Sequence, residues 1–82
     1  MTAAIRQILR DHGRLPVDPD DLADDADLYQ AGLTSHASVN VMLAVEDTFD
    51  TEFPDEMLTR ASFESIGAIA SAVGRLTGDA AA

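Results

Sequence analysis

The sequence predicts a small all-α protein with three main helices, one short helix and a long loop after the first helix. The chain has 82 residues, which is enough for one small domain. Apolar residues recur at helical spacing in three segments, and no segment shows the period-two alternation of a strand. Pro16, Pro19 and Pro54 all lie between those segments. We therefore expect one domain over residues 1–82, with a frayed tail at residues 77–82.

The first helix is indicated by Ile5, Ile8 and Leu9, which form one apolar stripe at positions i, i+3 and i+4. Gly13 is expected to end this helix in a left-handed conformation. The connection that follows, residues 14–33, holds six aspartates within ten positions. Its apolar residues are spaced like anchors on a core, which favours an ordered, packed loop. These anchors are Leu15, Val17, Leu22, Leu28, Tyr29 and Leu33.

The second main helix is predicted from Thr34 or Ser35 to about Phe49 or Asp50. Gly32 permits a tight turn before it. The helix is apolar on most of its surface, so we expect it to lie at the centre of the bundle. Its acids lie only in the last turns, where they oppose the helix dipole. Because acids at this end do not stabilise the helix, their placement hints at a role other than stability.

The last third of the chain predicts a short helix and then a long one. Pro54 suits the first position of a short helical turn over Asp55 to Thr59. Ser62 is a good cap for the last helix, whose apolar stripe is Phe63, Ile66, Ile69 and Val73. Gly67 inside that helix is costly for helix formation and therefore suggests close packing.

Composition excludes several classes of function. The chain carries 15 Asp and Glu against five Arg, with no Lys, for a net charge of −10. Binding to nucleic acid or to an anionic membrane surface needs the opposite charge. The absence of Cys excludes disulfides and any thiol chemistry of the chain's own. Residues 28–45 carry no charge, but polar residues interrupt them, so we reject a membrane span. Residues 1–7 lack the apolar core of a signal peptide, so we expect a cytoplasmic protein.

Neither a metal site nor a catalytic site is predicted. An EF-hand frame starting at Asp18 places Leu22 at a ligand position, and one starting at Asp25 places Gln30 where Gly is required. Weak divalent-cation binding by the acidic loop stays open beside the simpler interpretation of a solvated loop. Ser35 and His36 are adjacent on a helix and point about 100° apart, so they cannot form a nucleophile–base pair. We therefore expect no catalytic residue and no enzyme.

Ser35 is the remaining candidate, and on residue type alone it is a helix cap. However, the segment Asp27–Ser35, with sequence DLYQAGLTS, resembles the approach to the modified serine of acyl carrier proteins. The segment Val39–Glu56 resembles the second helix and exit loop of that family without gaps. Its specific parts are the Glu46-Asp47 pair, Phe49 and the run FPDE at residues 53–56. The resemblance covers nearly the whole chain.

The resemblance implies an acyl-carrier-like bundle in which Ser35 is the attachment site of 4′-phosphopantetheine. A Mg-dependent phosphopantetheinyl transferase takes this group from coenzyme A. The arm's thiol holds an acyl or aminoacyl group as a thioester, so that catalysis is left to a loading ligase and a downstream acceptor enzyme. Ser38 is a competing hydroxyl, but it lies inside the helix. The lead-in and exit segments resemble discrete bacterial carriers of specialised pathways. Some of these are charged with an amino acid by ligases similar to class II aminoacyl-tRNA synthetases. Fatty-acyl and aminoacyl cargo both stay open, and we expect a monomer.

Three departures from the family pattern concern the partner surface. Thr34 stands where Asp is common, His36 where Leu is common and Asn40 where Glu is common. The first turns of the helix have thus lost acids that basic partners contact, which predicts a narrow set of dedicated partners. The residues expected to contact partners are Leu33, Thr34, His36, Val39, Asn40, Glu46, Asp47, Asp55 and Glu56. Candidates to line a cargo cleft are Met42, Leu43, Val45, Phe53, Met57, Leu58 and Ile66, for which core packing is the simpler interpretation.

A second hypothesis, which assigns a different class of function, stays open. The protein is then a non-covalent acidic adaptor that docks a basic partner, and Ser35 serves only as a helix cap.

Overall fold

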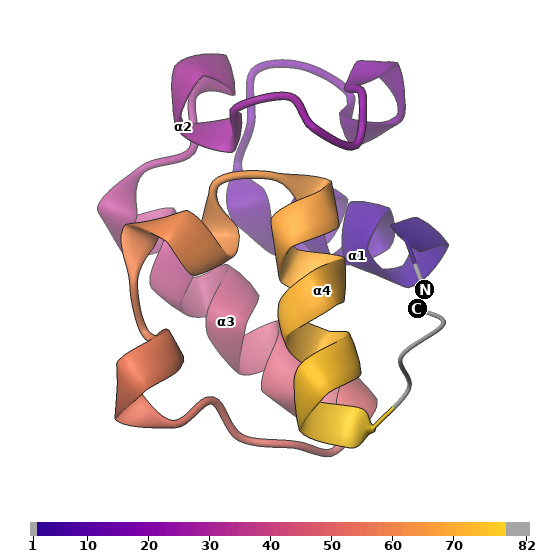
Figure 1. The fold of residues 1–82 in the computed structure, drawn as a ribbon. Coiled ribbons are helices and arrows are strands. Elements are labelled where there is room, and N and C mark those ends of the chain that lie inside the picture. Colours follow the sequence, from indigo (N-terminus) through magenta and orange to yellow (C-terminus); the bar gives the residue numbers. More distant parts are fainter. Residues whose placement is uncertain (1, 79–82) are drawn as a thin grey trace.

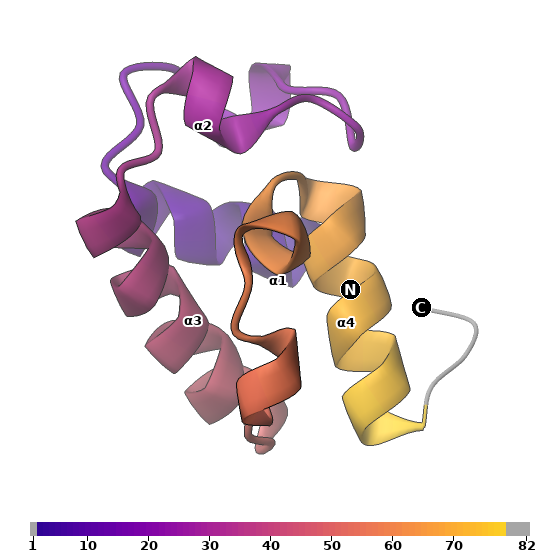
Figure 2. The ribbon, with the colours of Figure 1, turned by 60° about the vertical axis from the view of Figure 1, so that its left-hand side comes forward.

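The computed structural model describes residues 2–78 and shows a helical bundle without strands over that range (Figures 1 and 2). The predicted all-α class is confirmed. Helix α1 continues directly into a π-helical turn, and the connections carry several short elements. The elements are α1 (Thr2–Ile8), η1 (Leu9–Gly13), η2 (Pro19–Asp21), α2 (Leu28–Ala31), α3 (Ser35–Phe49), η3 (Asp55–Met57), η4 (Arg60–Phe63) and α4 (Ile66–Thr77). Gly78 caps α4, and residues 79–82 of the predicted tail lie outside the described residues.

The core lies between α1, α3 and α4. Ile5 and Leu9, the α3 residues Val41 and Val45, and Ile69 of α4 are all fully buried. Burying one such side chain contributes about 1.5–3 kcal/mol. Helix α3 therefore lies at the centre of the bundle, as predicted. Within residues 2–78, no helix has both the length and the apolar character that crossing a membrane requires.

Arg6 of α1 holds the long acidic connection against the bundle. Its guanidinium donates hydrogen bonds to the carbonyl oxygens of Pro19 and, at 2.8 Å, Leu22. It also forms an ion pair with Asp24 at 2.6 Å. The loop is therefore ordered and packed, as predicted, although one of its six predicted anchors, Val17, is 44% exposed and does not anchor it.

Arg10, one turn further along, holds the same loop at a second point. Its Nη2 lies 2.9 Å from Asp18 and 2.8 Å from Asp20. The backbone N–H of Asp20, which donates to the Asp18 carboxylate, and the guanidinium of Arg10 together lower the pKa of Asp18. The two arginines thus use part of the acidic charge to fix the loop.

The far side of the loop is fastened to the start of α4 through backbone hydrogen bonds. The N–H of Leu28 donates to the carbonyl of Glu64 at 2.7 Å, and that of Gly67 donates to the carbonyl of Asp24 at 2.8 Å. A Cβ at Gly67 would lie 3.2 Å from the Asp24 oxygen. The close packing predicted at Gly67 is confirmed.

Three predicted helix ends need correction. The left-handed residue after η1 is Arg14, at φ 52°, because the helical turn continues through Gly13. The cap of α4 is Ser65 rather than Ser62, and its Oγ accepts from the N–H of Ala68 at 3.0 Å. Ser62 instead lies within η4, a separate 3-10 turn at Arg60–Phe63, and the short helical turn predicted at residues 55–59 is present as η3 but ends at Met57.

Candidate functional site

The site begins at the turn between α2 and α3. Gly32 adopts φ 121°, and its N–H caps the end of α2 by donating to the carbonyls of Leu28 and Tyr29. A Cβ at this position would lie 2.6 Å from Cδ of Pro16. Both the positive φ and the close approach of the loop therefore require glycine, and the predicted tight turn is confirmed.

Leu33 anchors this turn in the core. Its N–H donates to the carbonyl of Leu28 at 2.9 Å, and its side chain is only 4% exposed. A partner cannot reach a side chain at that depth, so the prediction that Leu33 contacts partners is wrong. Its burial instead fixes where α3 begins.

Thr34, and not Ser35, caps α3. The Thr34 Oγ1 accepts from the N–H of Ala37 at 3.0 Å, and its backbone is extended at φ −91° and ψ 162°. Ser35 is the first helical residue and is exposed. Within residues 2–78 its hydroxyl has no hydrogen-bond partner. The hydroxyl of Ser35 is therefore available for chemistry, and the premise of the adaptor hypothesis, that this residue is the cap, is wrong.

The competing hydroxyl of Ser38 is already engaged. It donates to the backbone carbonyl of Ser35 at 2.7 Å, and the residue is only partly exposed. Ser35 is thus the better placed of the two serines for modification.

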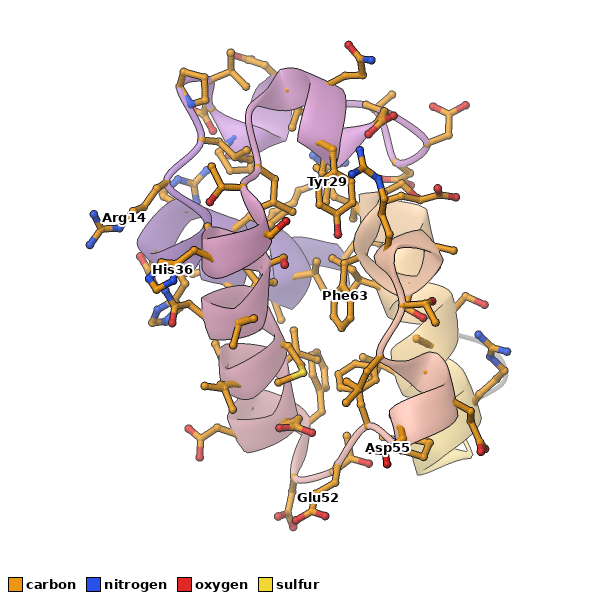
Figure 3. The ribbon with its side chains drawn as sticks, turned by 90° about the vertical axis from the view of Figure 1, so that its left-hand side faces the viewer. Arg14, Tyr29, His36, Glu52, Asp55 and Phe63 are labelled. Carbon is orange, nitrogen blue, oxygen red and sulfur yellow. The ribbon has the colours of Figure 1, made fainter. Side chains whose placement is uncertain are left out.

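The start of α3 suits a covalently bound phosphate group. The backbone N–H groups of Ser35 and His36 have no partner among the described residues, and the first turn carries no acid. The free N–H groups and the dipole of a 15-residue helix favour negative charge there. Figure 3 shows the side chains of His36 and Arg14 at the surface on the same side of this helix start. The residues present therefore fit a phosphodiester on Ser35.

An apolar hollow of about 250 Å³ opens between α3 and the η3–η4 segment. Of the cargo-cleft candidates, Met42 and Leu58 line it, whereas Val45, Phe53 and Ile66 are buried in the core. Leu43 faces elsewhere, and Met57 packs on the core. Core packing is thus confirmed for the three buried candidates. The hollow is lined by Tyr29, Ser38, Val39, Met42, Leu58, Thr59 and Phe63.

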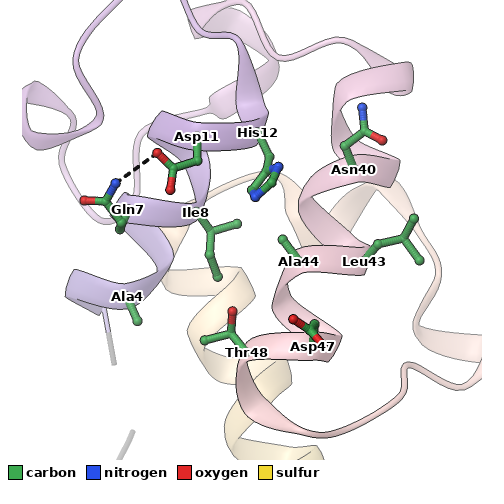
Figure 4. Close-up of a pocket in the computed structure, with 10 residues that line it drawn as sticks. All are labelled: Ala4, Gln7, Ile8, Asp11, His12, Asn40, Leu43, Ala44, Asp47 and Thr48. Carbon is green, nitrogen blue, oxygen red and sulfur yellow. Dashed lines mark hydrogen bonds between the residues drawn. The ribbon is translucent and has the colours of Figure 1, made fainter.

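The second flank of α3 carries a larger groove of about 580 Å³, which it forms with α1 and η1 (Figure 4). Asn40 and Asp47 line this groove on the α3 side, and Asp11 and His12 line it on the other side. Sequence analysis missed the wall formed by α1 and η1, because nothing in a linear pattern shows which loop residues face a distant helix.

The predicted partner residues lie around the start of α3, further along that helix and on η3. Thr34, His36 and Val39 are exposed around the start of α3. Asp55, at the far end of the molecule from His36, and its neighbour Glu56 are exposed on η3 (Figure 3). Glu46 also has a structural role. Its Oε2 accepts from the N–H of Phe53 at 2.7 Å, and this hydrogen bond holds the loop after α3 against the helix. This bond explains an acid near the C-terminal end of the helix.

No group of three or more His, Asp or Glu side chains is arranged to hold a metal ion in the part of the chain from residue 2 to residue 78. Several acids of the loop instead bind Arg6 and Arg10 or cap the short helices η2 and α2.

A small helical bundle with a free serine hydroxyl at the start of its central helix defines a class of protein, the carriers of a serine-linked prosthetic group. Residues 3–73 match the family model described as the phosphopantetheine attachment site. The chain belongs to this family of phosphopantetheine-dependent carrier proteins.

One curated relative has a more specific function than the family as a whole. A curated aminoacyl carrier protein from Agrobacterium fabrum is 56% identical over 73 residues, covering 89% of this chain and 88% of the relative. This chain is therefore a homologue of an aminoacyl carrier protein.

Two crystal structures contain similar chains. One is an engineered Bradyrhizobium japonicum glycine:[carrier protein] ligase complexed with the carrier protein from Agrobacterium tumefaciens and AMP. Its matching chain has a TM-score of 0.87 and 56% identity, over 89% of this chain and 97% of that chain. The other is the Bradyrhizobium japonicum ligase complexed with glycylated carrier protein. Its matching chain has a TM-score of 0.74 and 28% identity, over 87% of this chain and 95% of that chain.

Proposed function

We propose that the Ser35 hydroxyl carries a 4′-phosphopantetheine arm on which the protein holds an aminoacyl group and delivers it to an acceptor enzyme. The proposal rests on one observation: two adjacent residues at the start of α3 have different roles. Thr34 supplies the cap, and Ser35 is left exposed with a free hydroxyl. A Mg-dependent phosphopantetheinyl transferase can therefore reach the nucleophilic oxygen without unfolding α3.

The arm supplies the thiol that a chain without Cys lacks. The chain's own residues position it. Gly32 and Leu33 fix the turn, so that the Ser35 side chain projects from a rigid helix start. The N–H groups of Ser35 and His36 stabilise the negative charge of the phosphodiester. Catalysis is left to the partner enzymes.

Amino acid rather than fatty acyl cargo is favoured by the similarity to a curated aminoacyl carrier protein and to a carrier solved in its glycylated form. The loading enzyme is then an amino acid:[carrier protein] ligase, and glycine is the first amino acid to test.

The partner surface includes the first turns of α3 and the acids beyond them. Because those turns are uncharged, recognition there depends on shape and hydrogen bonds, which restricts the protein to dedicated partners. We place the protein in the cytoplasm as a monomer. The contacting residues are Thr34, His36, Val39, Asn40, Glu46, Asp47, Asp55 and Glu56.

Loading of the phosphopantetheinylated protein tests this function. The protein is incubated with ATP, single amino acids and the engineered glycine:[carrier protein] ligase, and its mass is measured before and after hydroxylamine treatment. We expect one aminoacyl group, released by hydroxylamine as a thioester is. Ser38→Ala is the matched control and should load normally, whereas Ser35→Ala should not load. A fatty-acyl thioester on protein from its native cell would contradict the aminoacyl assignment.

A further inference from the structure

We propose that the groove between α1–η1 and α3 docks a basic, amphipathic segment of the ligase that loads this carrier (Figure 4). The inference deepens the proposed function and rests on it for the identity of the partner. The groove lies on the flank of α3 away from the apolar hollow, and its two walls come from segments about 40 residues apart in sequence.

The floor and one edge of the groove are aliphatic. Ile8 and Ala44 lie at its floor, and Leu43 stands at its edge with 53% of its surface exposed. A large apolar side chain this exposed gains most when a partner covers it. The hydrocarbon part of a lysine or arginine side chain, or an aliphatic side chain beside it, fits such a floor.

Each wall of the groove combines polar side chains, such as His12 and Asn40, with one aspartate. Asp11 lies on one wall and Asp47 on the other. The amide of Gln7 donates to Asp11 Oδ1 at 3.0 Å, which orients that carboxylate and leaves its second oxygen free. Across residues 2–78 neither aspartate has an ion-pair partner, because the nearby Arg6 and Arg10 are bound to the loop. On a chain of net charge −10, these carboxylates complement a cationic occupant.

The groove also lies in the right place relative to the attachment serine. Its α3 residues Asn40, Leu43 and Asp47 follow Ser35 by five to twelve positions. At 1.5 Å per residue they lie roughly 7–18 Å along the helix axis from it. An enzyme seated there can place its catalytic centre within reach of the thiol at the end of an arm attached at Ser35.

A nuclear magnetic resonance titration locates the docking surface without requiring the arm. The uniformly ¹⁵N-labelled protein, without the prosthetic group, is titrated with the engineered glycine:[carrier protein] ligase. We expect the largest shift changes or line broadening at the amides of Asp11, Leu43 and Asp47. Effects confined to the segment Leu58–Phe63, or no binding at all, would overturn the inference.

Loading kinetics provide the quantitative test. In the phosphopantetheinylated protein, Asp11→Asn and Asp47→Asn should each raise the KM for loading about fivefold at low salt and leave kcat nearly unchanged. Asp25→Asn removes the same charge from an exposed loop position and is the matched control. Equal effects of all three variants, or none, would show that the groove has no specific role. If Ser35 is never modified, the proposed function fails, whereas the titration still decides the docking surface.

Discussion

At the scale of single residues, the function depends on which of two adjacent hydroxyls caps α3. Residue types alone allowed the helix to start at Thr34 or Ser35, because both are good caps. The structure gives the cap to Thr34 and the first helical position to Ser35. If α3 began one residue later, Ser35 would be the cap and its hydroxyl would no longer be free.

Replacing each hydroxyl separately tests this division. Thr34→Ala removes the acceptor for the Ala37 N–H and should lower the free energy of unfolding by about 1 kcal/mol. Ser35→Ala should change it by less than about 0.5 kcal/mol, because its hydroxyl has no partner within residues 2–78. Thermal unfolding followed by circular dichroism measures both. A larger loss for Ser35→Ala than for Thr34→Ala would mean that the cap is misassigned.

Asp18 predicts a specific acid dependence of stability. Its pKa is lowered by the N–H of Asp20 and by Arg10. A carboxyl with a lowered pKa in the folded state stabilises the fold above its unfolded pKa, about 4. That contribution is lost as the pH falls through the folded pKa.

The wild-type protein should therefore melt higher than Asp18→Asn at pH 7, and the two melting curves should converge below about pH 4. Scanning calorimetry from pH 2 to pH 7 checks this, with Asp25→Asn as the control for loss of a loop charge. A difference between wild type and Asp18→Asn that stays constant with pH would refute the role of this carboxylate.

At the scale of elements, the three main helices were predictable because their apolar stripes are long and regular. Among the short elements, only the turn after Pro54 was predicted. Asp27 caps α2 by accepting from the N–H groups of Tyr29 and Gln30, but a four-residue helix leaves no periodic pattern. Ser62 and Ser65 are equally good caps by residue type, and the choice between them depends on where the chain turns.

The loop could be predicted as ordered, but its attachments could not. In the sequence, Arg6 and Arg10 are four residues apart and off the apolar stripe of the first helix, and the aspartates form a charged run. Which arginine binds which aspartate depends on the path of the loop across the bundle. Leu33 was predicted both as an anchor on the core and as a partner contact, and its burial favours the first of these roles.

Gly32→Ala tests the turn that positions the site. Alanine would be strained at φ 121° and would place its Cβ 2.6 Å from Pro16 Cδ. Together these effects should cost about 2–4 kcal/mol of stability. Gly78→Ala is the matched control, because Gly78 also has a positive φ, of 77°, but nothing lies within 4 Å of its added Cβ. Urea unfolding measures both variants, and similar losses in the two would show that the contact with Pro16 has no effect.

At the scale of the whole molecule, excess negative charge sets how stability responds to salt. The chain carries a net charge of −10, and the Cα extents of the structure are 32 × 24 × 19 Å. The Debye length is about 30 Å at 0.01 M salt and about 3 Å at 1 M. At low salt, therefore, all the acids repel one another across the molecule.

We accordingly expect the melting temperature to rise with added NaCl at pH 7. Screening also weakens the ion pairs of Arg6 and Arg10, but exposed pairs contribute only about 0–1 kcal/mol each. Differential scanning fluorimetry from 0.01 to 1 M NaCl, repeated with MgCl₂, is the measurement. A melting temperature that falls or stays constant would show that self-repulsion is not the dominant long-range effect.

The attachment of the prosthetic group to Ser35 is the central claim, and peptide mapping by mass spectrometry tests it most directly. The protein is isolated from its native cell, digested and fragmented so that each serine is resolved. The account predicts one phosphopantetheine group per chain, located on Ser35. A protein that never bears the group in its own cell, or that bears it on Ser38, would contradict the account.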